Sequence, residues 1–236
     1  MSNEYLDVGQ YHMDQNKYES LVRENLNAYP DGVRLGPEYA EWIQENTTRL
    51  LIRLARYKFV SKWIRKSDSV LEVGSGSGLG SIYLGQYCEE VLGIDVKSSD
   101  IDDAKKLNKR NNVRFEMQDL FETSQSEDFD VVVSLDVIEH MDMKNGAKFL
   151  EAKSRRIKKD GLLIVGTPSI YSLPYQSAIS QASHIKCYDL PELQELVEKY
   201  FERSIAFSMN DELVHTGHYK MAWYYFVIGI GKKPLL

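Results

Sequence analysis

The spacing of apolar residues changes near residue 65 of this 236-residue chain. Over residues 38–64 the apolar positions recur near helical spacing; they are Trp42, Ile43, Leu50, Leu51, Leu54 and Phe59. The polar residues 46–48 interrupt this run and predict two helices. Beyond residue 65, short apolar runs alternate with amphipathic segments. The change predicts a helical N-terminal extension or lid over residues 1–64 and a single globular domain over residues 65–236.

The second region consists of predicted strands that alternate with predicted helices. The strands are expected at residues 70–73, 91–96, 113–117, 129–135, 161–166, 203–209 and 222–230. The helices are expected at residues 79–89, 99–110, 144–159 and 191–200. Strands separated by helices pair in parallel, whereas two strands joined only by a loop run antiparallel. The pattern therefore predicts an α/β fold with a seven-stranded, mostly parallel sheet, helices on both faces and a C-terminal antiparallel hairpin.

A glycine-rich turn follows the first predicted strand. Gly74, Gly76 and Gly78 alternate directly before a predicted helix. Glycines at such a place let the backbone turn tightly and let a ligand approach closely, and the helix start adds oriented N–H groups. The dinucleotide-binding pattern G-x-G-x-x-G is not met, because Leu79 or Ser81 would occupy its last position. The turn predicts a ligand site of another kind, and a tight turn without a ligand is the alternative.

Three acidic residues lie at the predicted strands around this turn. Glu72 is on the first strand, Asp95 ends the second and Asp119 follows the third. The carboxyl ends of parallel strands meet at one edge of the sheet, so these side chains should converge. A carboxylate after the second strand is suited to bind ribose hydroxyls. Each acid alone could instead cap a helix or face solvent.

The amino-acid composition limits which partners the protein is expected to bind and in which compartment it is expected to work. There are 29 Lys and Arg residues against 35 Asp and Glu residues, a net charge of −6, which argues against binding to duplex nucleic acid. The basic run Lys153, Arg155, Arg156, Lys158 and Lys159 is expected to be a solvated helix face. Two cysteines are too few for a disulfide scaffold or a thiolate metal cluster. No run of 18 apolar residues and no signal peptide is found, so we expect a cytoplasmic protein that does not bind a membrane.

These motifs together resemble those of class I S-adenosylmethionine-dependent methyltransferases. The resemblance rests on residues 72–78, on Asp95 and Asp119, and on the segment 134–140, Ser-Leu-Asp-Val-Ile-Glu-His, and it runs from about residue 52 to the C-terminus. It implies a Rossmann-like fold and S-adenosyl-L-methionine as the cofactor. The segment 136–140 is similar to that of small-molecule O-methyltransferases of the ubiquinone pathway.

The resemblance also implies which residues bind the cofactor. The glycine loop would contact the methionine part, Asp95 the ribose, and Asp119 the adenine amine. Arg56, in a segment that resembles an R-Y-x-F motif, would reach the methionine carboxylate, or it could be an exposed helix residue. The full set of cofactor-binding residues implied is Arg56, Glu72, Gly74, Ser75, Gly76, Gly78, Asp95, Val96, Asp119, Leu120 and Ser134.

Two histidines are the candidates for proton removal from the methyl acceptor. A sulfonium methyl group is already activated, so the protein must align the acceptor and, for a hydroxyl or amine, remove its proton. His140 follows the fourth predicted strand and His184 follows the fifth. Either could instead have a packing or capping role. Glu139, His140 and His184 could form a metal site, but no i,i+4 pair or cysteine cluster supports one, and we expect no bound metal.

The sequence therefore predicts transfer of a methyl group to an oxygen or nitrogen of a small molecule by direct in-line displacement. Surface-glycan, nucleotide-sugar, quinone-like and other secondary metabolites all fit as acceptors. An RNA or protein methyltransferase is one alternative, and a non-catalytic cofactor-binding subunit with the same fold is another. The sequence leaves a homodimer open.

Overall fold

The structure is a computed structural model that describes residues 15–28, 32, 35–122 and 128–234. The chain divides into two compact units, residues 1–34 and residues 35–236. In the first unit the structure describes one helix, α1 (Gln15–Ala28). Residues 1–14 of the predicted lid lie outside the described part. The division into a lid over residues 1–64 and a catalytic domain over residues 65–236 stays a prediction.

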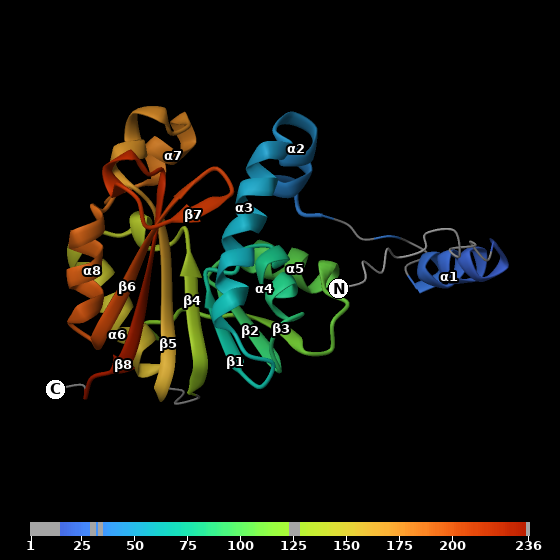
Figure 1. Ribbon diagram of the computed structural model, residues 1–236, viewed down its shortest axis with the longest axis horizontal. Coiled ribbons are helices and arrows are strands. Elements are labelled where there is room, and N and C mark those ends of the chain that lie inside the picture. The colour runs from blue at the N-terminus through green and yellow to red at the C-terminus, as the bar shows by residue number, and fades with distance from the viewer. Residues whose placement is uncertain (1–14, 29–31, 33–34, 123–127, 235–236) are drawn as a thin grey trace, which may run out of the picture. The chain divides into compact units, whose positions relative to one another are not determined.

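The second unit is built on an eight-stranded sheet. Its strands are β1 (Ser69–Val73), β2 (Glu90–Asp95), β3 (Val113–Met117), β4 (Phe129–Leu135), β5 (Ile157–Pro168), β6 (Phe201–Asn210), β7 (Leu213–His215) and β8 (Tyr224–Lys232). They lie in the order β3-β2-β1-β4-β5-β8-β6-β7 (Figure 1). The first five strands in this order are parallel, and β8, β6 and β7 add antiparallel pairs.

This arrangement confirms the mostly parallel sheet and its antiparallel C-terminal end. The described residues contain eight strands rather than the seven expected, because β7 lies within the segment that was predicted to be a loop. Asp211, with a φ of 49°, makes the turn between β6 and β7. A strand of three residues is too short to show an alternating pattern in the sequence.

Helices cover both faces of the sheet, as predicted (Figure 1). The helices of this unit are α2 (Pro37–Glu45), α3 (Thr47–Val60), α4 (Leu79–Leu84), α5 (Ser98–Leu107), α6 (Met143–Arg155), α7 (Ala178–Ser183) and α8 (Leu190–Glu198). On one face α3, α4 and α5 bury Val60, Leu84 and Ile101 against the strands. On the other face α6 and α8 bury Phe149 and Leu193. The sheet thus lies between two apolar clusters, and its carboxyl edge carries the loops.

The basic run spans the end of α6 and the start of β5 and is only partly solvated, so the prediction of a solvated helix face was wrong in part. Arg155, Lys158 and Lys159 are exposed, but Lys153 and Arg156 are buried. Lys153 lies three and four residues after the buried Leu150 and Phe149, which places it on the apolar stripe of the helix. Helical position, rather than charge, therefore decides its burial.

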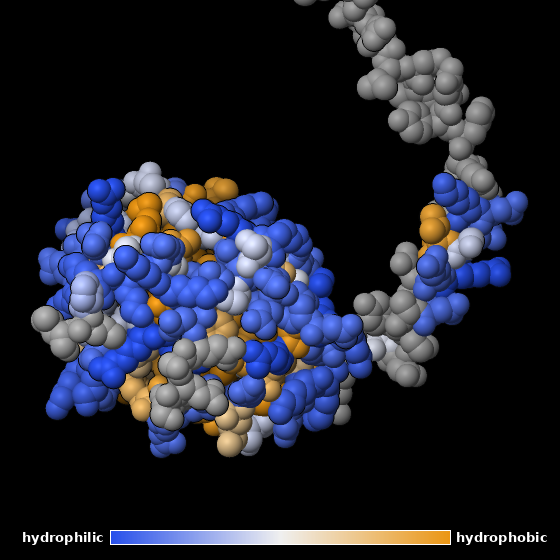
Figure 2. Space-filling view, turned by 90° about the horizontal axis from the view of Figure 1, so that it is seen from below, coloured by the Kyte–Doolittle hydropathy of each residue, from blue (hydrophilic) through white to orange (hydrophobic). Residues whose placement is uncertain are grey.

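The surface of the second unit is mainly hydrophilic on the face shown in Figure 2, where apolar side chains form smaller patches between polar ones. Among the helices of the described residues, none combines the length and the apolar character needed to cross a bilayer.

Candidate functional site

The glycine loop connects β1 to α4 at the carboxyl edge of the sheet. Gly74, Gly76 and Gly78 have φ values of 80°, 52° and 88°, in the left-handed region that favours glycine. A Cβ on Gly74 would lie 2.3 Å from Cγ2 of Val137, so this glycine is required by packing. A Cβ on Gly76 would meet nothing within 4 Å. The loop therefore packs closely at its start and borders open space at its centre.

Asp95 holds the centre of this loop. Its Oδ2 atom accepts a hydrogen bond from the backbone N–H of Gly76 at 2.9 Å, and its Oδ1 atom accepts one from the N–H of Lys97 at 3.0 Å. The contact arises because β1 and β2 are paired in parallel, with Glu72 opposite Gly93. Val96, which follows Asp95, is exposed. The open space at the centre of the loop thus lies next to the Asp95 carboxylate.

The turn after β3 lies beside the turn after β2. The N–H of Gln118 donates to the carbonyl oxygen of Asp95 at 3.0 Å. The Oδ1 atom of Asp119 accepts from the N–H of Phe121 at 2.9 Å, and Leu120 is buried. The turns after the second and third strands therefore lie side by side, while the convergence of the three acidic side chains stays a prediction.

Glu72 is buried beneath the loop and does not line open space. It accepts hydrogen bonds from the hydroxyl of Tyr57 at 2.7 Å and from the hydroxyl of Ser81. Burial raises the pKa of Glu72 to about 6, although the two hydroxyl groups oppose this shift. Through these hydrogen bonds, Glu72 on β1 contacts both α3 and the start of α4. Ser75 is buried in the loop itself.

Arg56 is paired with a carboxylate of this chain. Its Nη1 atom lies 2.8 Å from Oδ1 and 2.6 Å from Oδ2 of Asp136, and Nη1 of Arg53 lies 2.7 Å from the same Oδ2. The Arg56 guanidinium also stacks 3.8 Å from the centroid of the Tyr224 ring. Burial would raise the pKa of Asp136, but Arg56 and Arg53 outweigh this and hold it below its usual value. Two guanidinium groups therefore share one carboxylate, which leaves a positive charge at this point.

Asp136 has a strained backbone. Its φ is 59°, although it is not a glycine, and its N–H donates to the carbonyl oxygen of Gly166 at 3.0 Å. Such conformations gather at functional sites because the surrounding structure must hold them in place. Asp136 belongs to the 134–140 motif, but no sequence pattern indicates that it pairs with Arg56.

Ser134 lies within β4, which pairs with β1 up to the start of the loop. It is buried, and its Oγ atom accepts a hydrogen bond from Nζ of Lys153 at 2.5 Å. That Nζ atom lies 4.2 Å from the centroid of the Phe149 ring. Burial lowers the pKa of Lys153 well below its usual value. The role of Ser134 toward the cofactor stays a prediction.

The two predicted histidines meet. The ring centroids of His140 and His184 are 5.1 Å apart, although 44 positions separate them in the sequence. One ring nitrogen of each and one carboxylate oxygen of Glu139 lie within 4.8 Å of one another. Side chains can share a cation at this spacing, the possibility that the sequence analysis raised for these three residues, and the expectation of no bound metal stays a prediction.

The environment of Glu139 and His184 favours their uncharged forms. Glu139 is buried, and burial followed by the nearby Asp136 raises its pKa well above the usual value. Its Oε2 atom accepts from the hydroxyl of Thr167 at 2.9 Å. Burial and the neighbouring His140 lower the pKa of His184. Neutral imidazoles can accept a proton, as the predicted role requires.

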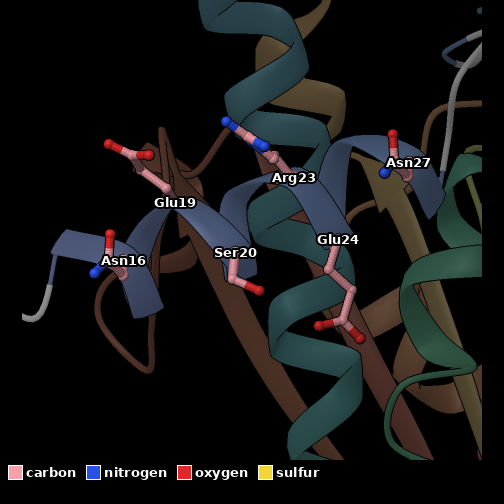
Figure 3. Close-up of a pocket in the computed structure, with 6 residues that line it drawn as sticks. All are labelled: Asn16, Glu19, Ser20, Arg23, Glu24 and Asn27. Atoms are coloured by element: carbon pink, nitrogen blue, oxygen red, sulfur yellow. The ribbon is translucent and has the colours of Figure 1, made fainter.

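A separate recess lies on α1, in the first unit (Figure 3). It is lined by polar side chains of this one helix, namely Asn16, Glu19, Ser20, Arg23, Glu24 and Asn27. Ligand sites usually enclose most of their ligand within apolar walls, which the face of a single helix does not provide. We assign no binding role to it.

Comparison with known proteins agrees with this geometry. A family described as "Methyltransferase domain" matches residues 71–165. The chain is 32% identical over 154 residues to a ubiquinone biosynthesis O-methyltransferase of Rickettsia akari; the match covers 64% of this chain and 57% of that relative. The chain thus spans little more than half the length of this curated relative.

Two solved structures share the fold. A possible histamine N-methyltransferase from Thermotoga maritima superposes with a TM-score of 0.65 at 18% identity, covering 82% of this chain and 94% of its own. The N-methyltransferase NodS of Bradyrhizobium japonicum, solved with S-adenosyl-L-homocysteine, gives a TM-score of 0.54 at 17% identity, covering 93% of this chain and 100% of its own. The sheet order, the glycine loop with its acids and the match over residues 71–165 support a class I S-adenosylmethionine-dependent methyltransferase, with S-adenosylmethionine as the cofactor.

Proposed function

We propose that this chain transfers a methyl group from S-adenosylmethionine to an oxygen or nitrogen of a small molecule. The observation that carries this proposal is the open space at Gly76, where a Cβ would meet no atom within 4 Å while Asp95 holds the loop in place. Open space beside a glycine backbone, next to a carboxylate, fits the close approach of a ligand that carries ribose hydroxyls and an amino-acid group. The residues present therefore fit the cofactor.

The cofactor-binding residues are assigned as the family resemblance implies. The loop from Gly74 to Gly78 would hold the methionine part, Asp95 the ribose, and Val96, Asp119 and Leu120 the adenine. Arg56 would bind the methionine carboxylate, which the excess positive charge of the Arg53, Arg56 and Asp136 group favours. Bound S-adenosylmethionine would supply an activated methyl group on a sulfonium.

The chain's own contribution to the reaction would be alignment and proton removal. His140 and His184 lie together, and burial lowers the pKa of His184, so that its ring is neutral near pH 7. A neutral imidazole next to the acceptor would take the proton of a hydroxyl or amine as the methyl group arrives. We place the acceptor beside these two rings.

The surroundings favour an acceptor with an aromatic or apolar part. Large apolar side chains remain exposed on residues 170–185, which include α7, and on the segment before β8; they are Tyr171, Tyr175, Ile179, Ile185, Met221 and Trp223. The rings of Tyr175 and Trp223 are 5.2 Å apart. Exposed apolar patches of this kind mark sites of ligand or protein contact. The name of the Rickettsia relative supports a hydroxyl acceptor, so we favour O-methylation of a phenol-like molecule over a glycan or nucleotide sugar.

Two measurements test the proposal. Calorimetric titration with S-adenosyl-L-homocysteine should show binding that Asp95→Ala weakens by about tenfold or more, because hydrogen bonds to a charged group contribute about 1.5–3 kcal/mol each. The exposed Asp102 provides the matched control, Asp102→Ala, which should bind normally.

The second measurement follows labelled methyl transfer into pooled phenols, RNA and protein. Label in the phenols supports the proposal. Label only in RNA or protein, or binding without any transfer, favours the corresponding alternative and contradicts it.

A further inference from the structure

We propose that Gln176 is a positioning residue that fixes His184 in the tautomer with hydrogen on Nδ1, so that the lone pair lies on Nε2. The proposal rests on the proposed function, in which His184 is a candidate base. A neutral imidazole carries one hydrogen and one lone pair, and only the nitrogen with the lone pair can accept a proton. Which nitrogen that is depends on the groups around the ring.

The orientation of the Gln176 amide follows from a chain of hydrogen bonds. The hydroxyl of Ser172 donates to the carbonyl oxygen of Ser169 at 2.7 Å, and both residues are buried. Because that hydroxyl hydrogen is used, Ser172 Oγ can only accept from Gln176. The amide atom 2.8 Å from Ser172 Oγ must then be the nitrogen, Nε2. The amide oxygen is thereby turned toward His184.

The ring of His184 must complete this chain as a donor. Its Nδ1 atom lies 2.8 Å from Oε1 of Gln176, and an amide oxygen has no hydrogen to give. Nδ1 therefore carries the hydrogen and Nε2 the lone pair. The amide assignment, which cannot be read from atom positions alone, is settled here by the direction of the chain that ends at the Ser169 carbonyl.

His140 reaches the same tautomer by another route. Its Nδ1 atom lies 2.9 Å from the backbone carbonyl oxygen of Ser183, the last residue of α7. Carbonyl groups at the end of a helix lack partners within the helix, so this one can only accept from the ring. Both imidazoles of the cluster therefore offer Nε2 as the basic atom, one through the backbone and one through a side chain that can be replaced.

His215 shows the opposite arrangement in the same chain. Its Nδ1 atom accepts from the N–H of Gly217 at 3.0 Å, and its Nε2 atom lies 2.9 Å from Oδ1 of Asn210. The Asn210 amide is oriented by Nδ2, which donates to the carbonyl oxygen of Met221 at 3.0 Å. His215 therefore carries its hydrogen on Nε2 and serves as an internal reference.

The test is the tautomer of each ring, measured by long-range ¹H–¹⁵N correlation on histidine-labelled protein at about pH 8, where unperturbed imidazoles are neutral. His184→Asn assigns the His184 signals. We expect Nδ1–H for His184 and Nε2–H for His215. In Gln176→Met the Nε2–H form of His184 should appear, with His215 unchanged as evidence of an intact fold. Gln176→Glu, which keeps an acceptor oxygen, should restore Nδ1–H. Gln86→Met, a control at an exposed position on another segment, should change nothing.

Two results would overturn the proposal: Nε2–H for His184 in the unmodified protein, or full retention of Nδ1–H in Gln176→Met. Neither depends on methyl transfer, so a failure of the proposed function is separately visible. Where transfer is measured, its rate should fall in Gln176→Met in proportion to the lost Nδ1–H population and recover in Gln176→Glu.

Discussion

The guanidinium of Arg56 donates to both carboxylate oxygens of Asp136, at 2.8 and 2.6 Å. The pair joins α3 to the strained residue that follows β4, across 80 positions of sequence. It makes Arg56 a part of the folded core of the site as well as a candidate ligand for the cofactor carboxylate. Changing Arg56 should therefore affect stability and binding together.

We expect Arg56→Gln to lower the free energy of unfolding by about 1.5–3 kcal/mol, because hydrogen bonds to a buried carboxylate are lost. Asp136 has a lowered pKa, so its pairing stabilises the protein above the usual pKa of Asp and ceases to do so as pH falls through the folded-state pKa. Denaturant unfolding at several pH values should show the difference from the unmodified protein shrinking below about pH 4. The exposed Arg65, changed to Gln, is the control; an equal effect there would contradict the prediction.

Gly76→Ala should strongly weaken the binding of S-adenosyl-L-homocysteine, whereas its effect on the free energy of unfolding should be limited to the backbone cost. The added methyl group would enter open space that the ligand needs, while the left-handed backbone costs about 1–2 kcal/mol. Gly32 is a close match, with a φ of 63° and no atom within 4 Å of the position that a Cβ would take. Calorimetry on Gly76→Ala and Gly32→Ala should show loss of affinity in the first variant alone. Equal affinity in both would remove Gly76 from the cofactor site.

Lys153→Met should stabilise the protein. The buried Lys153 has a lowered pKa, so the unfolded chain binds a proton that the native state does not, and this cost is about 1.4 kcal/mol per unit of lowering. For the same reason the unmodified protein should gain stability as pH rises from neutral toward the usual range of Lys, and Lys153→Met should lack that slope. Thermal unfolding between about pH 7 and 10 measures both effects. Lys148→Met, at an exposed position of the same helix, should leave the slope in place.

Glu139→Gln should remove a pH dependence of stability that is opposite in sign to that of Lys153. Burial and Asp136 raise the pKa of Glu139, so its protonated form stabilises the native state below the usual pKa of Glu. That contribution is lost as pH rises through the raised pKa. In denaturant unfolding from about pH 5 to 9, the free energy of unfolding of the variant should rise relative to that of the unmodified protein. If the two proteins show parallel curves of unfolding free energy against pH, Glu139 is ionised throughout and the prediction is wrong. The control is Glu195→Gln, at an exposed position.

The sheet could be predicted because its signals are local. The run from Phe129 to Leu135 is apolar throughout most of its length since β4 is covered on both faces, and its predicted limits match those of the strand. The glycine loop was visible for a similar reason, because three left-handed positions in five residues require glycine. Strand ends then placed the turns that carry Asp95 and Asp119 side by side without knowledge of any long-range contact.

The rest depends on contacts between distant residues. The helical spacing turns Lys153 inward, but nothing near it in sequence identifies Ser134 as its partner. Likewise, nothing near Asp136 shows two arginines from α3. Gln176 directly follows the short helix η4 (Ile170–Tyr175), where the pattern of apolar residues has no regular period. Its role follows from a chain of four polar groups, which single-residue preferences do not encode.

The added strand β7 has a consequence for self-association. A sheet edge offers unpaired N–H and C=O groups to any passing strand, and such edges promote aggregation when they are long and flat. Here β7, three residues long, covers the end of the ten-residue β6. At the opposite edge, β3 carries the exposed charges of Arg114 and Glu116. Of the residues that the structure describes, both outermost strands are therefore poor templates for the growth of an intermolecular sheet.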